Sequence, residues 1–137
     1  MYKDFYSYIA VVSFDEDGIS IDFPDLPGCF TCADNEDEIF AMAKEVLGLH
    51  LWGLETDNEL IPEPSPLRDI KTDSNESTML IEVFMPPIRD RQNNKVINKT
   101  LTIPQWLNWE AEHAGVNFSQ LFQNALKEYL HIPGGQR

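Results

Sequence analysis

Apolar side chains recur at every second position in three stretches of the first 86 residues, namely 6–14, 19–23 and 79–85. Successive side chains of a strand point to opposite faces, so this period of two predicts strands with one buried face. Asp17 and Gly18, between the first two stretches, form a hairpin turn signal. A second turn at residues 24–28 leads into a further short strand, 29–33. We therefore expect four strands, of which the first two form an antiparallel hairpin.

Between the third and the fourth strand, apolar residues recur at steps of three and four, as on one face of a helix. Asn35, followed three residues later by Glu38, forms a capping box that marks the start of this helix. Its predicted apolar face consists of Ile39, Ala43, Val46, Leu47, His50, Leu51 and Leu54. Residues 1–86 are therefore expected to form a small α+β domain with the element order β-β-β-α-β.

Residues 95–137 combine one strand-like run with two helical runs. In the strand, Leu101 and Ile103 point to one side, whereas Asn98, Thr100 and Thr102 point to the other. Pro104 suits the start of one helix and Gly115 its end, and Asn117 with Gln120 opens a second, amphipathic helix. A unit of 43 residues rarely buries enough apolar surface to fold alone. We expect a homodimer, in which the strand pairs antiparallel with its copy.

Such a two-stranded ribbon fits the major groove of DNA, where Asn and Thr side chains can contact base edges. The order strand, Pro, helix, Gly turn and helix resembles the ribbon-helix-helix repressors. By that resemblance Asn98, Thr100 and Thr102 face bases, while the Asn117 and Ser119 region holds a phosphate. Lys99 lies on the inward side, but its long stem can reach a phosphate. The alternative is a plain dimerisation module, because residues 95–137 carry a net charge of only +1 from four basic and three acidic groups.

Charge divides the chain unevenly. The whole chain of 137 residues has a net charge of −13, and residues 1–94 hold 20 acidic and 6 basic side chains, a net charge of −14. An acidic domain repels nucleic acid and attracts a basic protein. The polar run 87–94 is the predicted linker between an acidic domain of residues 1–86 and a C-terminal module of residues 95–137.

Other sequence features exclude several classes. The chain has no apolar run long enough to cross a bilayer, and its start lacks the pattern of a signal peptide, so we expect a cytoplasmic protein without membrane contact. Cys29 and Cys32 are a single C-x-x-C pair whose odd spacing sends the two thiols to opposite faces of a strand. We expect them to be packing residues. No metal site, cofactor or catalytic residue is expected.

Four segments carry a resemblance to one family. They are the strand at residues 8–12, the Ile-Asp-Phe-Pro-Asp-Leu-Pro-Gly-Cys run at 21–29, the acidic helix start at 35–38 and Leu-Ile-Pro-Glu-Pro-Ser at 60–65. Together with the C-terminal module they closely resemble the HicB antitoxins. Members of that family join a partial RNase H-like domain, which blocks the small, basic, mRNA-cleaving HicA toxin, to a DNA-binding module. The resemblance therefore implies an antitoxin that also represses its own operon.

The acidic residues of the first domain allow two interpretations. In the preferred one, Asp22 and Asp25 flank an exposed apolar spot made by Phe23 and Leu26, and these four residues contact the toxin. In the other, Asp15, Asp17, Asp22 and Asp25 hold Mg²⁺ in a catalytic RNase H-like nuclease. The sequence also leaves open whether the expected dimers pair into tetramers.

Overall fold

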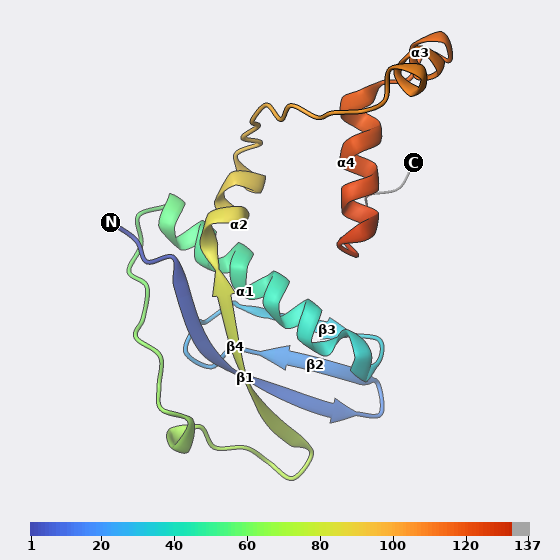
Figure 1. The fold of residues 1–137 in the computed structure, drawn as a ribbon. Coiled ribbons are helices and arrows are strands. Elements are labelled where there is room, and N and C mark those ends of the chain that lie inside the picture. Colours follow the sequence, from blue (N-terminus) through green and yellow to red (C-terminus); the bar gives the residue numbers. More distant parts are fainter. Residues whose placement is uncertain (133–137) are drawn as a thin grey trace. The chain divides into compact units, whose positions relative to one another are not determined.

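The computed structural model describes residues 1–132, and the chain divides into two compact units, Met1–Val96 and Ile97–Arg137 (Figure 1). The first unit is an α+β structure built on an antiparallel four-stranded sheet, and the second consists of helices and an irregular segment. No helix within residues 1–132 is long and apolar enough to cross a membrane. Because the relative placement of the two units is not determined, each is described by itself.

The sheet of the first unit has the strand order β3-β2-β1-β4. Its strands are β1 (Phe5–Asp15), β2 (Gly18–Asp22), β3 (Phe30–Ala33) and β4 (Glu76–Phe84). The central strand β1 pairs antiparallel with β2 and, over nine residues, with β4. The hairpin and all four predicted strands are therefore confirmed, with ends that differ by at most three residues from the predicted ones.

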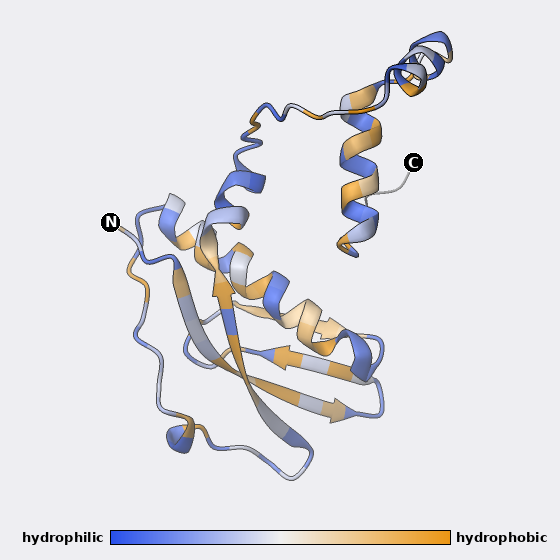
Figure 2. Cartoon of the chain, in the orientation of Figure 1, coloured by the Kyte–Doolittle hydropathy of each residue, from blue (hydrophilic) through white to orange (hydrophobic). Residues whose placement is uncertain are grey.

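One helix, α1 (Ile39–Thr56), covers one face of the sheet, as Figure 1 shows. The short 3-10 helix η1 (Glu36–Glu38) precedes α1, and the Asn35 side chain caps η1 by accepting a hydrogen bond from the amide of Asp37. Figure 2 shows that α1 contains both apolar and polar residues, and five of its small or apolar residues are buried, namely Ile39, Ala43, Leu47, Gly48 and Leu51. The buried residues of this core come from α1, the strands, the turn before β3 and the first residue of the helix that follows β4: Tyr6, Tyr8, Ala10, Val12, Ile21, Phe23, Leu26, Cys29, Ala33, Ile39, Ala43, Leu47, Leu51, Ile81, Val83 and Met85.

The predicted linker at residues 87–94 is largely helical. Helix α2 (Met85–Gln92) follows β4 directly, and its second and third residues are Pro86 and Pro87. Proline is tolerated in the first turn of a helix, because the backbone N–H that it lacks would have no helical partner there. It packs closely on α1, because a Cβ atom added to Gly48 would lie 2.5 Å from Cδ1 of Ile88. Arg89 of α2 also forms an ion pair with Glu55 of α1, at 2.9 Å. The first unit therefore extends past residue 86, and the prediction that residues 87–94 separate two domains is wrong for the helical part.

Three segments make up the described part of the second unit. Residues 97–104 have no regular secondary structure, and α3 (Gln105–His113) and α4 (Phe118–Tyr129) follow. Gly115, with φ of +73°, ends α3 in the left-handed conformation, and the Asn117 side chain caps α4 by accepting from the amide of Gln120 at 3.0 Å. Both predicted helices and their caps are confirmed. The single chain forms no strand over residues 98–103. The strand was predicted to pair with a second copy of the chain, so it stays a prediction.

Candidate functional site

Two of the four residues predicted to contact a basic protein lie in the core. Phe23 and Leu26 are each 1% exposed, so the apolar spot that they were predicted to form is not on the surface. The turn between β2 and β3 explains this burial. The amide of Leu26 donates to the carbonyl of Phe23 at 2.9 Å, and the amide of Cys29 donates to the carbonyl of Leu26 at 3.0 Å. These bonds tighten residues 23–29 into a compact loop whose two apolar side chains point inward.

The carboxylate of Asp25 is occupied within the unit. Its two oxygens accept hydrogen bonds from the backbone amide of Ser65, at 2.8 Å, and from the Ser65 hydroxyl, at 2.7 Å. A carboxylate with two such donors ties the long segment between α1 and β4 to the β2–β3 turn. Of the four predicted residues, only Asp22 is exposed. Asp22 is therefore the one predicted contact residue that stays available to a partner on the surface.

The sheet has a second face, opposite α1, which we call the outer face. Paired residues of antiparallel strands point to the same side, so the strand register places the following side chains there: Phe5, Ser7, Ile9, Val11, Ser13, Asp15, Ser20, Asp22, Phe30, Cys32, Glu76, Thr78, Leu80, Glu82 and Phe84. This set contains four carboxylates and no lysine or arginine. All charged side chains of the outer face are therefore negative.

Part of the outer face is an exposed apolar patch, which we call the β1–β4 patch and which consists of Phe5, Ile9, Leu80 and Phe84. The rings of Phe5 and Phe84 lie 4.7 Å apart, and Ile9 pairs with Leu80. Phe5, Leu80 and Phe84 are 55%, 65% and 45% exposed, whereas Ile9 is buried. Exposed apolar clusters of this kind mark interaction surfaces. The sequence contains a signal for this patch. In both strands, apolar residues also occupy positions on the side where an amphipathic strand would carry polar residues.

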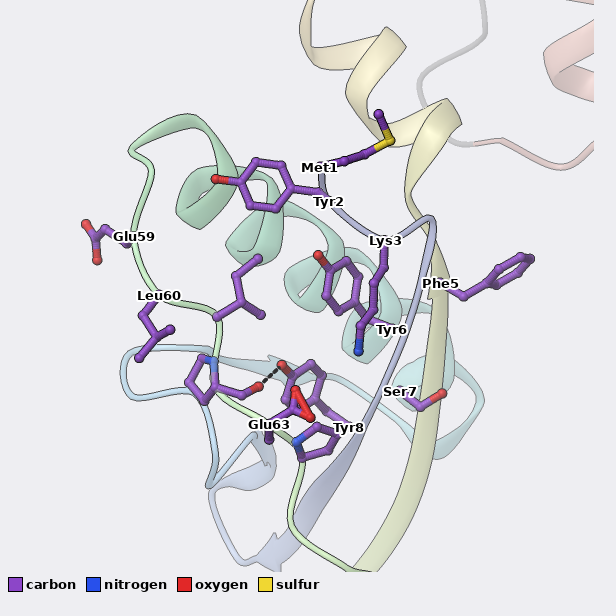
Figure 3. A pocket seen from close by; sticks show the side chains of 13 residues that line it. Met1, Tyr2, Lys3, Phe5, Tyr6, Ser7, Tyr8, Glu59, Leu60 and Glu63 are labelled. Carbon is purple, nitrogen blue, oxygen red and sulfur yellow. Dashed lines mark hydrogen bonds between the residues drawn. The ribbon is translucent and has the colours of Figure 1, made fainter.

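A cleft of about 520 Å³ lies between the start of β1 and residues 59–64 (Figure 3). Phe5 and Ser7 point away from the interior of this region, whereas Tyr6 and Tyr8 point into it. The Tyr8 hydroxyl donates a hydrogen bond to the Pro62 carbonyl. Burial raises the pKa of Tyr8 to about 12, and burial, with the nearby Glu55 carboxylate, also raises the pKa of Tyr6. Both phenols are therefore neutral near pH 7 and serve as packing and hydrogen-bonding groups.

The structure does not gather the four aspartates of the nuclease interpretation into a metal site. Within residues 1–132, no group of three or more His, Cys, Asp or Glu side chains is placed to hold a metal ion. Asp15 accepts from the side-chain amide of Asn75 at 2.8 Å, and Asp25 is bound to Ser65. Each of these two carboxylates thus has a local partner in the fold.

The two cysteines occupy different environments. Cys29 is buried, and this burial raises its thiol pKa to about 12, so the thiol stays protonated and behaves as a packing residue. Cys32 is exposed on the outer face. The opposite orientation of the two thiols is confirmed, but the prediction that both are packing residues is wrong for Cys32, because β3 is an edge strand.

The predicted DNA contacts lie on an open part of the second unit. Asn98, Thr100 and Thr102 are exposed, and so is Ser119 in the first turn of α4. Lys99, Leu101, Ile103, Phe118 and Ser119 line a common cavity of about 420 Å³. The odd-numbered residues of the segment therefore share one side, in agreement with the predicted alternation. The Asn117 side chain is used as the helix cap, so its contact with a phosphate would have to come from the backbone.

The second unit buries none of its described residues, 97–132. Large apolar side chains of both helices are exposed, among them Trp106, Trp109, Leu121, Leu126 and Tyr129. A folded unit needs a covered apolar core, and a single copy of this one lacks it in the part that the structure describes. These side chains are available for contact with a second copy.

Comparison with known proteins finds one matching family. Residues 8–126 match the profile of the HicB-like antitoxins of bacterial toxin-antitoxin systems. A curated relative from Haemophilus phage HP1 (strain HP1c1), an uncharacterized 14.9 kDa protein in the rep-hol intergenic region, is 37% identical over 51 residues. That match spans 37% of this chain and 38% of the length of the phage protein.

Two solved structures are similar to this chain to different degrees. A chain of a toxin-antitoxin complex from Streptococcus pneumoniae superposes with a TM-score of 0.58 at 24% identity, covering 91% of this chain and 99% of that chain. The crystal structure of the antitoxin HicB3 gives a TM-score of 0.49 at 21% identity, with 79% of this chain and 81% of that chain covered. The first of these similarities establishes a common α+β fold.

Proposed function

Because the chain belongs to the HicB-like antitoxin family of bacterial toxin-antitoxin systems, we propose that it binds and neutralises a HicA-like mRNA-cleaving toxin through Met1–Val96. We further propose that it represses its own operon by binding operator DNA through Ile97–Arg137. The first unit would then be the partial RNase H-like domain of the family, and the second a ribbon-helix-helix module. The protein acts by binding in both roles, and neither requires a catalytic residue.

The observation that carries this proposal is the division of charge between the two units. Residues 1–96 hold 20 acidic and 7 basic side chains, a net charge of −13, whereas residues 97–137 hold three of each and are neutral. A toxin that binds mRNA needs cationic groups for the phosphates, and an acidic protein surface complements the same groups. The phosphates of DNA would repel the acidic unit. The second unit is neutral, so it is not repelled in this way.

The DNA-binding half of the proposal rests on the open second unit. Pairing of residues 98–103 with the same strand of a second copy would satisfy the backbone groups of both and cover the apolar helices. The resulting ribbon would present Asn98, Thr100 and Thr102 to the major groove. We propose a homodimer as the DNA-binding form.

The toxin half is tested by titrating the full chain with the HicA-type toxin encoded beside its gene while cleavage of labelled RNA is followed. We expect a complex that stops cleavage and an association rate that falls as salt is added, because exposed charges are screened within about 10 Å at 0.1 M salt. Asp22→Lys should slow association and leave the fold intact. Absence of a complex would refute the antitoxin role. Mg²⁺-dependent cleavage by the chain alone would instead support the nuclease alternative.

The DNA half predicts different effects for neighbouring residues of the segment. Replacing Asn98, Thr100 or Thr102 by Ala should cost roughly 1–3 kcal/mol of operator affinity at each position that contacts a base, with little loss for random DNA. Lys99→Ala should weaken binding to all sequences alike and lower the salt dependence by about one counterion. Band-shift titrations at several salt concentrations measure both effects. If operator preference is unchanged while the protein stays dimeric, the second unit is a plain dimerisation module.

A further inference from the structure

Strand β4 has a free edge along most of its length. It is the last strand in the order β3-β2-β1-β4, so within residues 1–132 it pairs with a strand on one side only. At its first residue the outward amide is occupied, because Glu76 N–H donates to the Asp73 carbonyl at 3.1 Å. Two backbone bonds at its ends show which residues face β1: Met85 N–H donates to the Asp4 carbonyl at 2.7 Å, and Phe14 N–H donates to the Asn75 carbonyl at 2.9 Å. The register between them is unbroken. Because hydrogen-bonding direction alternates along a strand, the N–H and C=O groups of Thr78, Leu80 and Glu82 point outward.

This edge lacks the features that normally keep an edge strand from pairing. Natural edge strands are protected by proline, lysine, bulges or a covering element. Strand β4 contains no proline and no lysine, and its pairing with β1 has no bulge. Of its two glutamates, Glu76 is bound locally, to the Ser13 hydroxyl at 3.1 Å and the Asp73 amide at 2.9 Å. Glu82 is exposed and remains available to a partner.

The free edge lies beside the β1–β4 patch. The residues of β4 whose backbone groups point outward are also the ones whose side chains lie on the outer face, Leu80 and Glu82 among them. A strand added to this edge would therefore place every second side chain next to Leu80, Phe84 and, across β4, Phe5. In strand addition the backbone bonds supply affinity and alternate side chains supply specificity. Edge and patch thus form one continuous binding surface.

The charges on this surface favour a basic partner. The outer face carries four carboxylates and no lysine or arginine, and the unit as a whole has a net charge of −13. A second copy would bring an equal negative charge to the same surface, and nucleic acid would be repelled. A basic protein would instead find apolar side chains of the β1–β4 patch next to the carboxylate of Glu82. Its cationic groups are complementary to the negative charge of this surface.

We infer that the toxin binds the free edge of β4 by strand addition, with apolar side chains on the β1–β4 patch and a cationic side chain at Glu82. This inference rests on the proposed antitoxin function and names the surface through which it acts. Asp22, on the same outer face, then adds to the attraction at longer range.

The backbone part is tested with proline. Thr78→Pro removes one outward N–H and leaves the bonds between β4 and β1 in place, as proline is tolerated on the open side of an edge strand. Cys32→Pro is the matched control, because the Cys29 carbonyl accepts from Phe23 N–H and the alternation then directs Cys32 N–H away from β2, at the opposite edge. We expect Thr78→Pro to lower toxin affinity about tenfold or more, and Cys32→Pro to leave it within about threefold.

The side-chain part is tested by substitutions at exposed residues, which leave the fold intact. The inference can therefore be tested even if a proline variant fails to fold. Leu80→Asp and Glu82→Lys should each lower toxin affinity about tenfold. Their controls are Leu67→Asp, on the 3-10 helix η2 (Leu67–Asp69), and Glu45→Lys on α1, both at exposed positions outside this surface. Affinity for the HicA-type toxin is measured by calorimetry on full chains whose circular dichroism matches the wild type.

The outcomes separate the inference from the function on which it rests. If the wild-type chain does not bind the toxin, the proposed function fails. If it binds, and Leu80→Asp and Glu82→Lys bind equally well, the function stands and the surface is wrong. If the variants lower the mass of the free protein in solution without changing toxin affinity, the edge joins two copies of this chain and the inference is overturned.

Discussion

A chain that ends at Val96 is expected to be a monomer without operator affinity, whereas the full chain is expected to be a dimer. All residues of the buried core, from Tyr6 to Met85, lie in the first unit, so this fragment keeps its core. The removed part buries none of its described residues and exposes its apolar helices. Sedimentation should show that the particle mass falls from two chains to one. A fragment that remains dimeric through the same interface would refute the ribbon assignment.

Two full-length variants sharpen this test, because alternation places neighbouring residues on opposite sides of the segment. Leu101→Asp puts a charge on the side that faces the helices and should abolish both the dimer and operator binding. Thr102→Asp puts the same charge on the opposite side, so it should abolish operator binding by repelling phosphates and leave the dimer intact. Equal behaviour of the two variants would contradict the inward and outward assignment.

The strands and the long helix of the first unit were predictable because their signals are local. The period of two in residues 6–14 survives as the buried series Tyr6, Tyr8, Ala10 and Val12. Asn35 caps the start of the helical region as predicted, although its side chain accepts from the amide of Asp37 and the Glu38 carboxylate accepts from the amide of Asp34, so the full capping box does not form. Local hydrogen bonding and one-sided burial determine both features, so no knowledge of distant contacts was needed.

The features that were missed depend on contacts between distant segments. Two prolines and a polar run predicted a linker, but Ile88 and Arg89 anchor the same residues to α1. The Phe-Pro-Asp-Leu run was predicted to form an exposed apolar spot, yet a turn closed by three backbone bonds buries Phe23 and Leu26. Asp25 found a partner forty residues away in Ser65. Sequence patterns do not reveal such pairings, whereas the acidic character of the surface follows from composition alone.

The β1–β4 patch illustrates a related limit. Leu80 and Phe84 are apolar at positions of β4 where an amphipathic strand would be polar. A strand with two apolar faces is usually buried on both. Only the register, which places β4 at an edge and α1 on the opposite face, reveals that these side chains are exposed.

Replacing Arg89 is expected to destabilise the first unit more than any other surface change on α2. Its guanidinium binds both carboxylate oxygens of Glu55 at 2.9 Å and also reaches Asp4 at 2.9 Å, and the hydrogen bonds to Glu55 raise the pKa of Arg89. The Glu55 side chain is only 6% exposed. Arg89→Met leaves this buried carboxylate unpaired, which costs about 3–5 kcal/mol of unfolding free energy in comparable sites. Chemical denaturation followed by circular dichroism measures the loss.

A control and a double variant identify the cause of that loss. Arg91→Met, at an exposed position on the same helix, should change the unfolding free energy by less than about 0.5 kcal/mol. Adding Glu55→Met to Arg89→Met removes the unpaired charge and should restore most of the stability, because two packed apolar chains can replace a buried ion pair. If the double variant is less stable than Arg89→Met alone, Arg89 stabilises the unit through packing or through Asp4 and not by compensating Glu55.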